Sequence, residues 1–176
     1  MPKGCGSNLS ISDPVFLALN DEACRAKKII EDKAKKELSV ARKAKDIELK
    51  KWFEKELKNQ KHIVISSNQF LKNVHIDKFS INSILSHIGS VEGKEIIKDI
   101  KTVLKDAKHQ KGKDQLLDKK KPEKNLQRKI KRGVTGYRYY KSDWNGYEVT
   151  ISMEDNIHGY EQPYSFKLTK KHRKGT

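Results

Sequence analysis

Two segments near the C-terminus alternate between apolar and polar residues, and this alternation limits what the chain can fold into more than any other feature. The first segment runs from Tyr147 to Met153, and the second runs from Tyr164 to Thr169. Successive side chains of a β-strand point to opposite faces of the sheet, so every second residue shares a face. Each segment therefore predicts a strand with one apolar face and one face of small hydroxyl and charged groups.

A further strand is predicted just upstream, over the tyrosine-rich segment Val134–Lys141. The dipeptide Asn145-Gly146 that follows it is typical of a tight hairpin turn. Residues 154–163 have the polar and glycine content of a second turn. These segments together predict a three-stranded antiparallel meander at the end of the chain.

A long basic helix is predicted over residues 13–59, after a flexible segment of residues 1–12. Asp13 is a good N-cap and Pro14 suits the first helical turn, and neither Pro nor Gly recurs within the segment. The apolar residues follow helical spacing in a thin, alanine-rich stripe. Such a helix is either a solvated connecting element or an assembly element that pairs with a second copy. We expect it to meet the globular body at Trp52 and Phe53.

The part between the long helix and the meander mixes both kinds of element. Short strands are predicted at His62–Ser66 and Val74–Asp77, and a short helix capped by Ser80 at Ile81–Ile88. A stronger amphipathic helix is expected over residues 90–107. The predicted fold class is therefore α+β, in which residues 60–170 pack helices on one face of a small antiparallel sheet.

The chain is strongly basic, and the charge is concentrated in one segment. It has 39 Lys and Arg against 23 Asp and Glu, a net charge of +16. Residues 108–132 hold eleven basic and three acidic residues, and the tail, 171–176, adds more positive charge. The basic segment predicts a loop that either clamps phosphates or is an ordinary solvated surface. The candidate nucleic-acid-binding residues are Lys108, Lys111, Lys113, Lys119, Lys120, Lys121, Arg128, Lys129, Lys131, Arg132 and Lys167.

Several classes of protein are disfavoured by what the sequence lacks. No apolar run approaches the ~20 residues of a membrane-spanning helix, and the N-terminus has no apolar signal-peptide core, so we expect action in the cytoplasm. Cys5 and Cys24 have no histidine at metal-ligand spacing, and there is no glycine-rich phosphate loop. We therefore expect neither a bound metal nor another cofactor.

RNA is a substrate that this composition could cleave without a metal. Its 2′-hydroxyl is an internal nucleophile, so the protein needs a proton acceptor, a proton donor and a cation that stabilises the phosphorane. His87, at the end of the predicted short helix, has a ring suited to proton transfer. Alternatively, His87 is a structural residue that hydrogen-bonds the last carbonyls of that helix.

Arg138 is the candidate phosphate stabiliser, because its planar guanidinium matches phosphate oxygens. We expect it to share the polar face of the sheet with Ser165, Lys167 and Thr169. By strand parity, Tyr137 and Tyr139 point to the opposite face, and parity alone does not say which of the two faces is buried. Tyr139 therefore either packs in the core or faces the substrate, where it can stack on a base.

Several of these segments together resemble the barnase, EndoU, colicin and RelE-like nuclease superfamily, especially the forms found in phage proteins and polymorphic toxins. The resemblance covers roughly residues 47–170. It rests on the segments Leu49–Phe53, Ser80–His87, the amphipathic helix that follows, Tyr137–Tyr140, Asn145–Tyr147 and Tyr164–Thr169.

The resemblance implies a fold of helices followed by a four-stranded antiparallel sheet. It also implies metal-independent RNA cleavage, often of tRNA, with an acidic immunity protein or antitoxin as partner. Members often carry histidine where this chain has Arg138, so the catalytic base either moves to His87 or is lost. Thr169 lies where members keep a hydroxyl group.

These inferences predict a toxin-type ribonuclease in which His87 transfers protons and Arg138 stabilises the phosphorane. Ser165 and Thr169 would position the substrate, and Tyr139 would stack on a base or donate a proton. Two alternatives from other classes remain. One is a non-catalytic nucleic-acid-binding or phage packaging protein, and the other is a module whose basic face binds an acidic protein.

Overall fold

The computed structural model describes residues 14–66, 72–118 and 125–171, and the chain divides into two compact units, residues 1–43 and 44–176. The predicted long helix is confirmed as α1, Pro14–Leu57. In the first unit, the side chains of residues 18–43 are exposed apart from the half-buried Cys24. The rest of the helix belongs to the second unit, which contains all the other elements.

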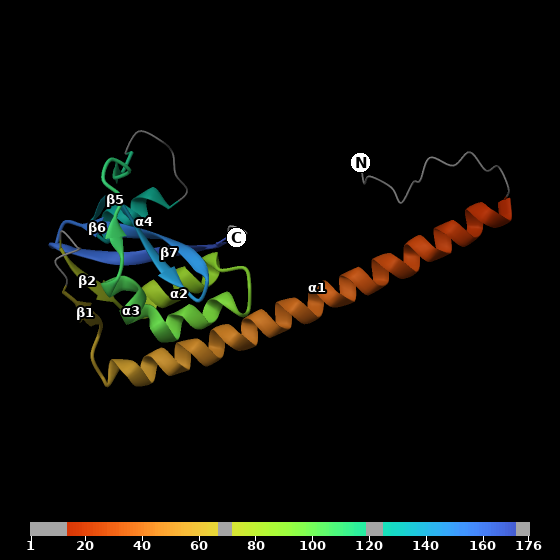
Figure 1. The fold of residues 1–176 in the computed structure, drawn as a ribbon, viewed down its shortest axis with the longest axis horizontal. Coiled ribbons are helices and arrows are strands. Elements are labelled where there is room, and N and C mark those ends of the chain that lie inside the picture. The colour runs from red at the N-terminus through yellow and green to blue at the C-terminus, as the bar shows by residue number, and fades with distance from the viewer. Residues whose placement is uncertain (1–13, 67–71, 119–124, 172–176) are drawn as a thin grey trace, which may run out of the picture. The chain divides into compact units, whose positions relative to one another are not determined.

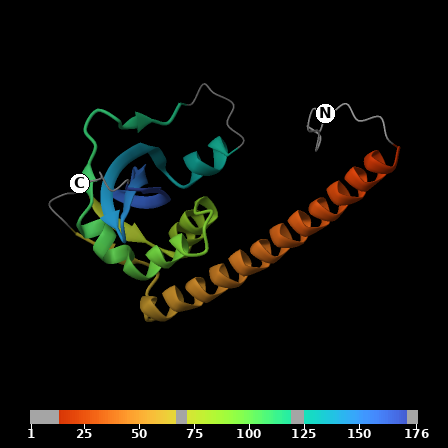
Figure 2. The same cartoon turned by 45° about the vertical axis from the view of Figure 1, so that its right-hand side comes forward.

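The second unit is α+β, as predicted, with helices and a curled mixed sheet (Figures 1 and 2). Its further helices are α2 (Lys78–His87), the 3₁₀ helix η1 (Gly93–Asp99), α3 (Ile100–Lys105) and α4 (Leu126–Lys131). Its strands are β1 (Ile63–Ile65), β2 (Asn73–Ile76), β3 (Lys108–His109), β4 (Gln115–Leu116), β5 (Val134–Trp144), β6 (Tyr147–Asn156) and β7 (Tyr160–Lys170).

The predicted meander is confirmed, because β5 pairs antiparallel with β6 and β6 pairs antiparallel with β7. The expectation of a wholly antiparallel sheet is wrong. The strand order is β1-β2-β7-β6-β5-β3, and β2 pairs parallel with β7 through Asn73 opposite Tyr160 and Val74 opposite Glu161. Parallel pairing requires a long connection, and here the helices and two meander strands supply it.

The second turn of the meander is shorter than the polar composition of residues 154–163 suggests. β6 continues to Asn156 and β7 begins at Tyr160. The polar side chains of Glu154 and Glu161 are buried in these strands, and each has a cationic or hydroxyl partner there. Satisfied partners allow polar residues inside a strand, so composition alone places the turn wrongly.

The helical region also differs in detail from the prediction. The short helix begins at Lys78, because Asp77 is the N-cap and Ser80 completes the capping box. The amphipathic segment 90–107 is divided into η1 and α3. The basic segment 108–132 is not simply a loop, since it supplies β3, β4 and α4.

The core lies between the apolar face of the meander and the end of α1 together with α2, η1 and α3. Val149, Ile151 and Phe166 are buried on that face, with Ile151 directly opposite Phe166. The last turns of α1 bring Leu49 and Phe53 into the same cluster, which confirms the predicted contact near Phe53. Helices α2 and α3 lie on one side of the sheet and α4 on the other (Figure 1).

We predict that Phe53→Ala lowers the free energy of unfolding by about 3–5 kcal/mol, because its ring is 1% exposed in the core. The matched control on the same helix is Ile47→Ala, whose side chain is 55% exposed and whose loss should cost about 0.5 kcal/mol or less. Urea denaturation followed by circular dichroism measures both. Equal effects of the two substitutions would contradict this packing.

Candidate nucleic-acid interface

The meander has a polar face opposite the core, which we call the open face. Three rows of paired residues define it: Tyr137–Glu154–Gln162, Tyr139–Ser152–Ser165 and Lys141–Thr150–Lys167. Most of these side chains are half-buried or exposed. The alternation of β6 and β7 thus does divide hydroxyl and cationic groups from the apolar core, as the sequence predicts.

Tyr164 lies at the centre of this region because of a register shift. Ser152 is opposite Ser165, but the next residue, Met153, is opposite Pro163, so Tyr164 has no direct partner on β6. This bulge directs the Tyr164 ring between two others. Its centroid is 5.0 Å from that of His87 and 5.9 Å from that of Tyr137.

A pocket of about 240 Å³ opens on one side of Tyr164, and we call it the cationic pocket. Its lining residues come from α2, from α4 and its two capping residues, from β6 and from β7: Phe79, Asn125, Arg128, Lys129, Arg132, Glu154 and Tyr164. Three cations and one carboxylate give the lining a net positive charge. The Lys129 ammonium lies 5.2 Å from the centroid of the Tyr137 ring.

Glu154 holds one of these cations in place. Its Oε2 accepts a hydrogen bond of 2.6 Å from Nη2 of Arg132, and the Arg132 guanidinium also lies 4.0 Å from the centroid of the Phe79 ring. Burial raises the pKa of Glu154, and the charge of Arg132 opposes that shift. Oε1 of Glu154 has no hydrogen-bond partner among the described residues. Arg132 is therefore oriented by an ion pair on one side and an aromatic ring on the other.

A second pocket, of about 220 Å³, lies beside His87 and we call it the histidine pocket. It is lined by His87, Ile88, Gly89, Ser90, Phe166, Lys167 and Leu168. The His87 side chain is exposed, and its Nδ1 lies 2.7 Å from the carbonyl oxygen of Ser83. A carbonyl only accepts hydrogen bonds, so Nδ1 carries the proton. Nε2 of the neutral ring then has the lone pair that can take up a proton.

Both sequence interpretations of His87 are therefore compatible with its geometry. The bond to Ser83 is the helix-end interaction proposed as the structural alternative. The same bond selects the tautomer that a general base needs, since an anchored Nδ1–H leaves Nε2 free for proton transfer.

The expectation that Arg138 shares a face with Ser165, Lys167 and Thr169 is wrong. Arg138 is opposite Met153 in the β5–β6 register, so its side chain lies on the core side of the sheet. Tyr139, its neighbour, is instead in the row of Ser165. Parity correctly separates Arg138 from Tyr139, but it does not determine which of the two shares a face with Ser165.

On the core side, Arg138 belongs to a network of charges in which Glu161 is buried and the other members are half-buried. Its Nη2 lies 3.1 Å from Asp155 and its Nε lies 3.2 Å from Glu161, while Lys72 lies 2.6 Å from Asp155. The Tyr140 hydroxyl donates to the same Glu161 carboxylate at 2.8 Å. Arg138 thus neutralises two carboxylates of the fold, and this position separates it from the open face.

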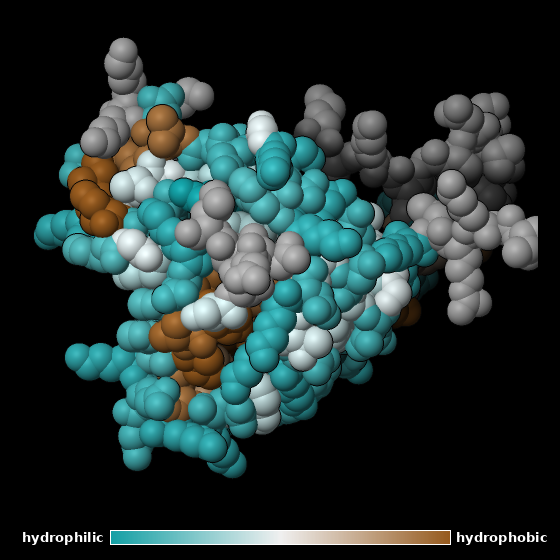
Figure 3. Space-filling model, turned by 60° about the vertical axis from the view of Figure 1, so that its left-hand side comes forward, coloured by the Kyte–Doolittle hydropathy of each residue, from teal (hydrophilic) through white to brown (hydrophobic). Residues whose placement is uncertain are grey.

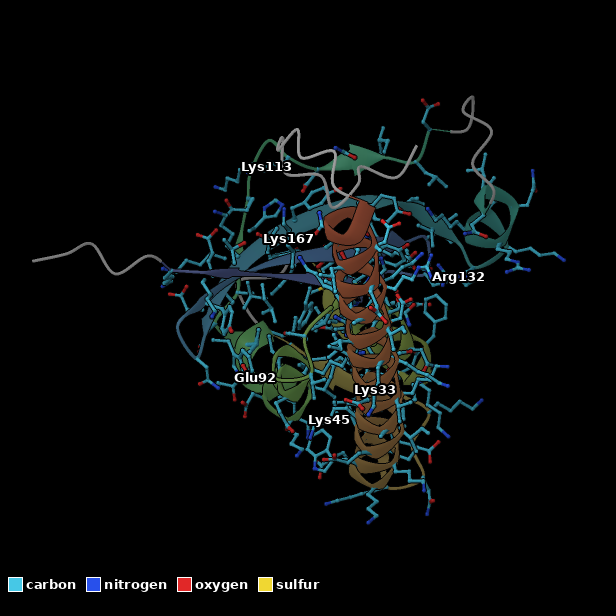
Figure 4. The ribbon with its side chains drawn as sticks, turned by 90° about the vertical axis from the view of Figure 1, so that its right-hand side faces the viewer. Lys33, Lys45, Glu92, Lys113, Arg132 and Lys167 are labelled. Atoms are coloured by element: carbon cyan, nitrogen blue, oxygen red, sulfur yellow. The ribbon has the colours of Figure 1, made fainter. Side chains whose placement is uncertain are left out.

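The remaining predicted residues are only partly brought together. Arg128, Lys129 and Arg132 gather in the cationic pocket, whereas Lys167 lies in the histidine pocket. Figure 4 labels Arg132 and Lys167, which lie apart from each other in the second unit. Ser165 is half-buried on the open face, and Thr169 is exposed further along β7. Lys111, Lys113 and Lys131 are exposed, and Lys108 lines a separate cavity of about 640 Å³. Lys119, Lys120 and Lys121 lie outside the described residues.

Phe79, Glu154 and Tyr164 are pocket residues that the sequence does not predict. The polar composition of residues 154–163 places Glu154 in a turn, and the alternation of residues 164–169 places Tyr164 on the apolar side of its strand. Glu154 does offer one signal, because it directly follows the alternating segment 147–153 and a strand that continued through it could bury its carboxylate. A buried carboxylate requires a cationic partner, so a nearby Lys or Arg is then expected. The bulge at Tyr164 leaves no comparable signal in the pattern.

Comparisons with protein-family models, curated proteins and solved structures found no match to this chain. Within residues 14–66, 72–118 and 125–171, no group of three or more His, Cys, Asp or Glu is placed to hold a metal ion. None of the helices described is long and apolar enough to cross a membrane. Most of the face seen in Figure 3 is hydrophilic, with hydrophobic atoms confined to limited areas.

We predict that Arg138→Met destabilises the protein increasingly as the pH rises. Burial raises the pKa of Glu161, and Tyr140 and Arg138 oppose that shift. Although burial disfavours the charged form of Asp155, its bonds to Lys72 and Arg138 hold its pKa below the ordinary value. Without Arg138 both native pKa values rise, while unfolded Asp and Glu still titrate near pH 4.

The native state of the variant then holds protons more tightly, so its deficit in unfolding free energy should grow above about pH 4. We expect a deficit of about 3 kcal/mol at pH 8 and a smaller one at pH 5 in urea denaturation. Lys141→Met, which removes only a half-exposed ion pair with Glu148, is the control and should cost under about 1 kcal/mol. A deficit that does not change with pH would argue against the network.

Proposed function

We propose that this protein is a metal-independent endoribonuclease of toxin type that cleaves RNA through the 2′-hydroxyl, with tRNA as the favoured substrate. The observation that carries the proposal is the geometry of His87. Its Nδ1 is anchored to Ser83, its ring is beside Tyr164, and it shares a pocket with Lys167. A histidine held in one tautomer next to a cation is suited to general acid–base catalysis on a phosphodiester.

The cationic pocket supports the choice of a nucleic acid as substrate. Arg128, Lys129 and Arg132 supply charge for phosphates, and Tyr164 joins this pocket to His87 through direct ring contact. Aromatic rings beside cations are the usual means of holding an unpaired nucleotide. In this arrangement Arg132, positioned by Glu154, binds a phosphate of the substrate in the cationic pocket, while Lys167 is the cation that shares a pocket with His87.

Tyr139, Ser165 and Thr169 have more modest roles in this proposal. Tyr139 and Ser165 are in one row of the open face, where their hydroxyl groups can contact the substrate backbone. Thr169 lies beyond Lys167 on β7 and serves at the margin of the interface. An acidic immunity protein or antitoxin would cover the same basic surface, because its charge is complementary to that of the pockets.

The second candidate function is non-catalytic binding of nucleic acid, as in a packaging or assembly protein. The ion pair of Arg132 with Glu154 favours it, because binding needs only oriented cations and aromatic rings. In that case the exposed apolar residues of α1, among them Leu19 and Ile30, would serve self-association.

The two functions are separated by incubating the protein with total tRNA in EDTA and analysing the products on a denaturing gel. Ribonuclease activity predicts discrete fragments that end in 2′,3′-cyclic phosphate. Intact RNA together with a gel shift supports the binding protein.

We predict that His87→Asn lowers the cleavage rate by about 10²–10⁴-fold, because the variant loses the proton-transfer group. The asparagine amide can still donate a hydrogen bond to the Ser83 carbonyl, so the melting temperature should stay nearly unchanged. Cleavage of a fluorescent RNA and thermal unfolding measure the two effects. His87→Ala serves for comparison, and full activity in either variant would refute the assigned role.

We predict that Arg128→Gln weakens RNA binding and makes it less sensitive to salt. Each lost phosphate contact should reduce the slope of log K against log salt concentration by about 0.7–0.9. The control is Lys101→Gln, since Lys101 lies on α3 and pairs with Glu56 away from the pocket lining. Fluorescence anisotropy over a range of salt concentrations gives the slopes, and equal slopes for the two variants would place the phosphates elsewhere.

A further inference from the structure

Three aromatic side chains form a continuous stack at the β1–β2–β7 end of the sheet. The centroids of His62 and His75 are 4.3 Å apart with ring planes at 10°. Those of His75 and Tyr160 are also 4.3 Å apart, with planes at 6°. All three side chains are half-buried. We call these residues the aromatic stack.

The stack is a product of the long-range strand pairing. His75 lies on β2 and Tyr160 begins β7, and the parallel pairing of Asn73 with Tyr160 brings these strands together. The neighbours of His75, Val74 and Ile76, are buried in the core. Because successive residues of a strand face opposite ways, the stack lies on the side of the sheet away from that core.

The stack shares its side of the sheet with the cationic pocket. Tyr160 is two residues from Gln162, and Gln162 is directly opposite Glu154 of the pocket. The same strand, β7, continues from Tyr160 to Tyr164 and then to Lys167 of the histidine pocket. At about 3.3 Å per residue, Tyr160 and Tyr164 are roughly 13 Å apart along the strand.

We propose that the aromatic stack is a platform for an unpaired nucleobase of the RNA strand that occupies the two pockets. The inference rests on the proposed function, and it adds that the substrate is single-stranded where it follows β7. Stacking on aromatic rings tolerates any base, because every base has a π-face. Burial, followed by the charge of His62, lowers the pKa of His75, so the central ring of the stack favours its neutral form.

The test compares Tyr160→Leu with Tyr160→Phe in binding a single-stranded oligonucleotide with 2′-O-methyl riboses, which cannot be cleaved through the 2′-oxygen. An abasic oligonucleotide of the same length carries the same phosphates without bases. We expect Tyr160→Leu to raise the Kd for the intact strand about 10-fold and to leave the Kd for the abasic strand unchanged. Tyr160→Phe keeps the ring and should bind like the wild type.

If Tyr160→Leu lowers the affinity for both oligonucleotides equally, or does not lower the affinity for the intact one, the proposed platform is wrong. Thermal unfolding checks that each variant is folded, and His62→Ala replaces Tyr160→Leu if the latter is not. Failure of the proposed function is recognised separately. If Tyr160→Leu weakens binding of the intact strand alone, but the wild-type protein leaves unmodified RNA uncleaved, the protein has the platform without ribonuclease activity. A wild-type protein that binds neither the intact nor the abasic strand has neither the platform nor the proposed function.

Discussion

The register of β7 against β6 is the constraint on which both faces of the second unit depend. The one-residue shift at Tyr164 places Glu161 and Pro163 on the core side before the bulge, and Phe166 and Leu168 on the same side after it. Without the shift, the residues after Tyr164 would point to the opposite faces of the sheet, and Phe166 would leave the core. The bulge thus keeps one core continuous and also presents Tyr164 between His87 and Tyr137.

Buried charge is the second organising feature, and it is divided between the two sides of the sheet. On the core side, Arg138 and Lys72 neutralise Asp155 and Glu161, and the network holds the ends of β5, β6 and β7 together. On the other side, Glu154 holds Arg132 in the lining of the cationic pocket. The two arginines are six residues apart, yet one stabilises the fold and the other is placed for a ligand.

Periodicity was enough to predict the meander, the long helix and the α+β class, because these features depend on local spacing. It could not place Arg138, because alternation defines two faces without saying which one is buried, and a polar residue at a core position requires knowledge of distant partners. Glu161 and Lys72 are such partners, and they are distant in sequence or assigned to a turn. The sequence places Arg128, Lys129 and Arg132 in one basic segment, so their proximity could be predicted. Phe79 and Tyr164 are distant in sequence and come near these cations only through the tertiary fold.

The parallel pairing of β2 with β7 also has a consequence for how the chain acquires its fold. β7 is flanked on both sides, by β2 and β6, although it follows every other strand in the sequence. During synthesis from the N-terminus, β1 and β2 therefore emerge well before the strand that completes their sheet. The edge of β2 stays without its partner strand for that interval, and pairings between residues so far apart form slowly. A protein of this design has to protect an unfinished edge until almost all of the second unit has been made.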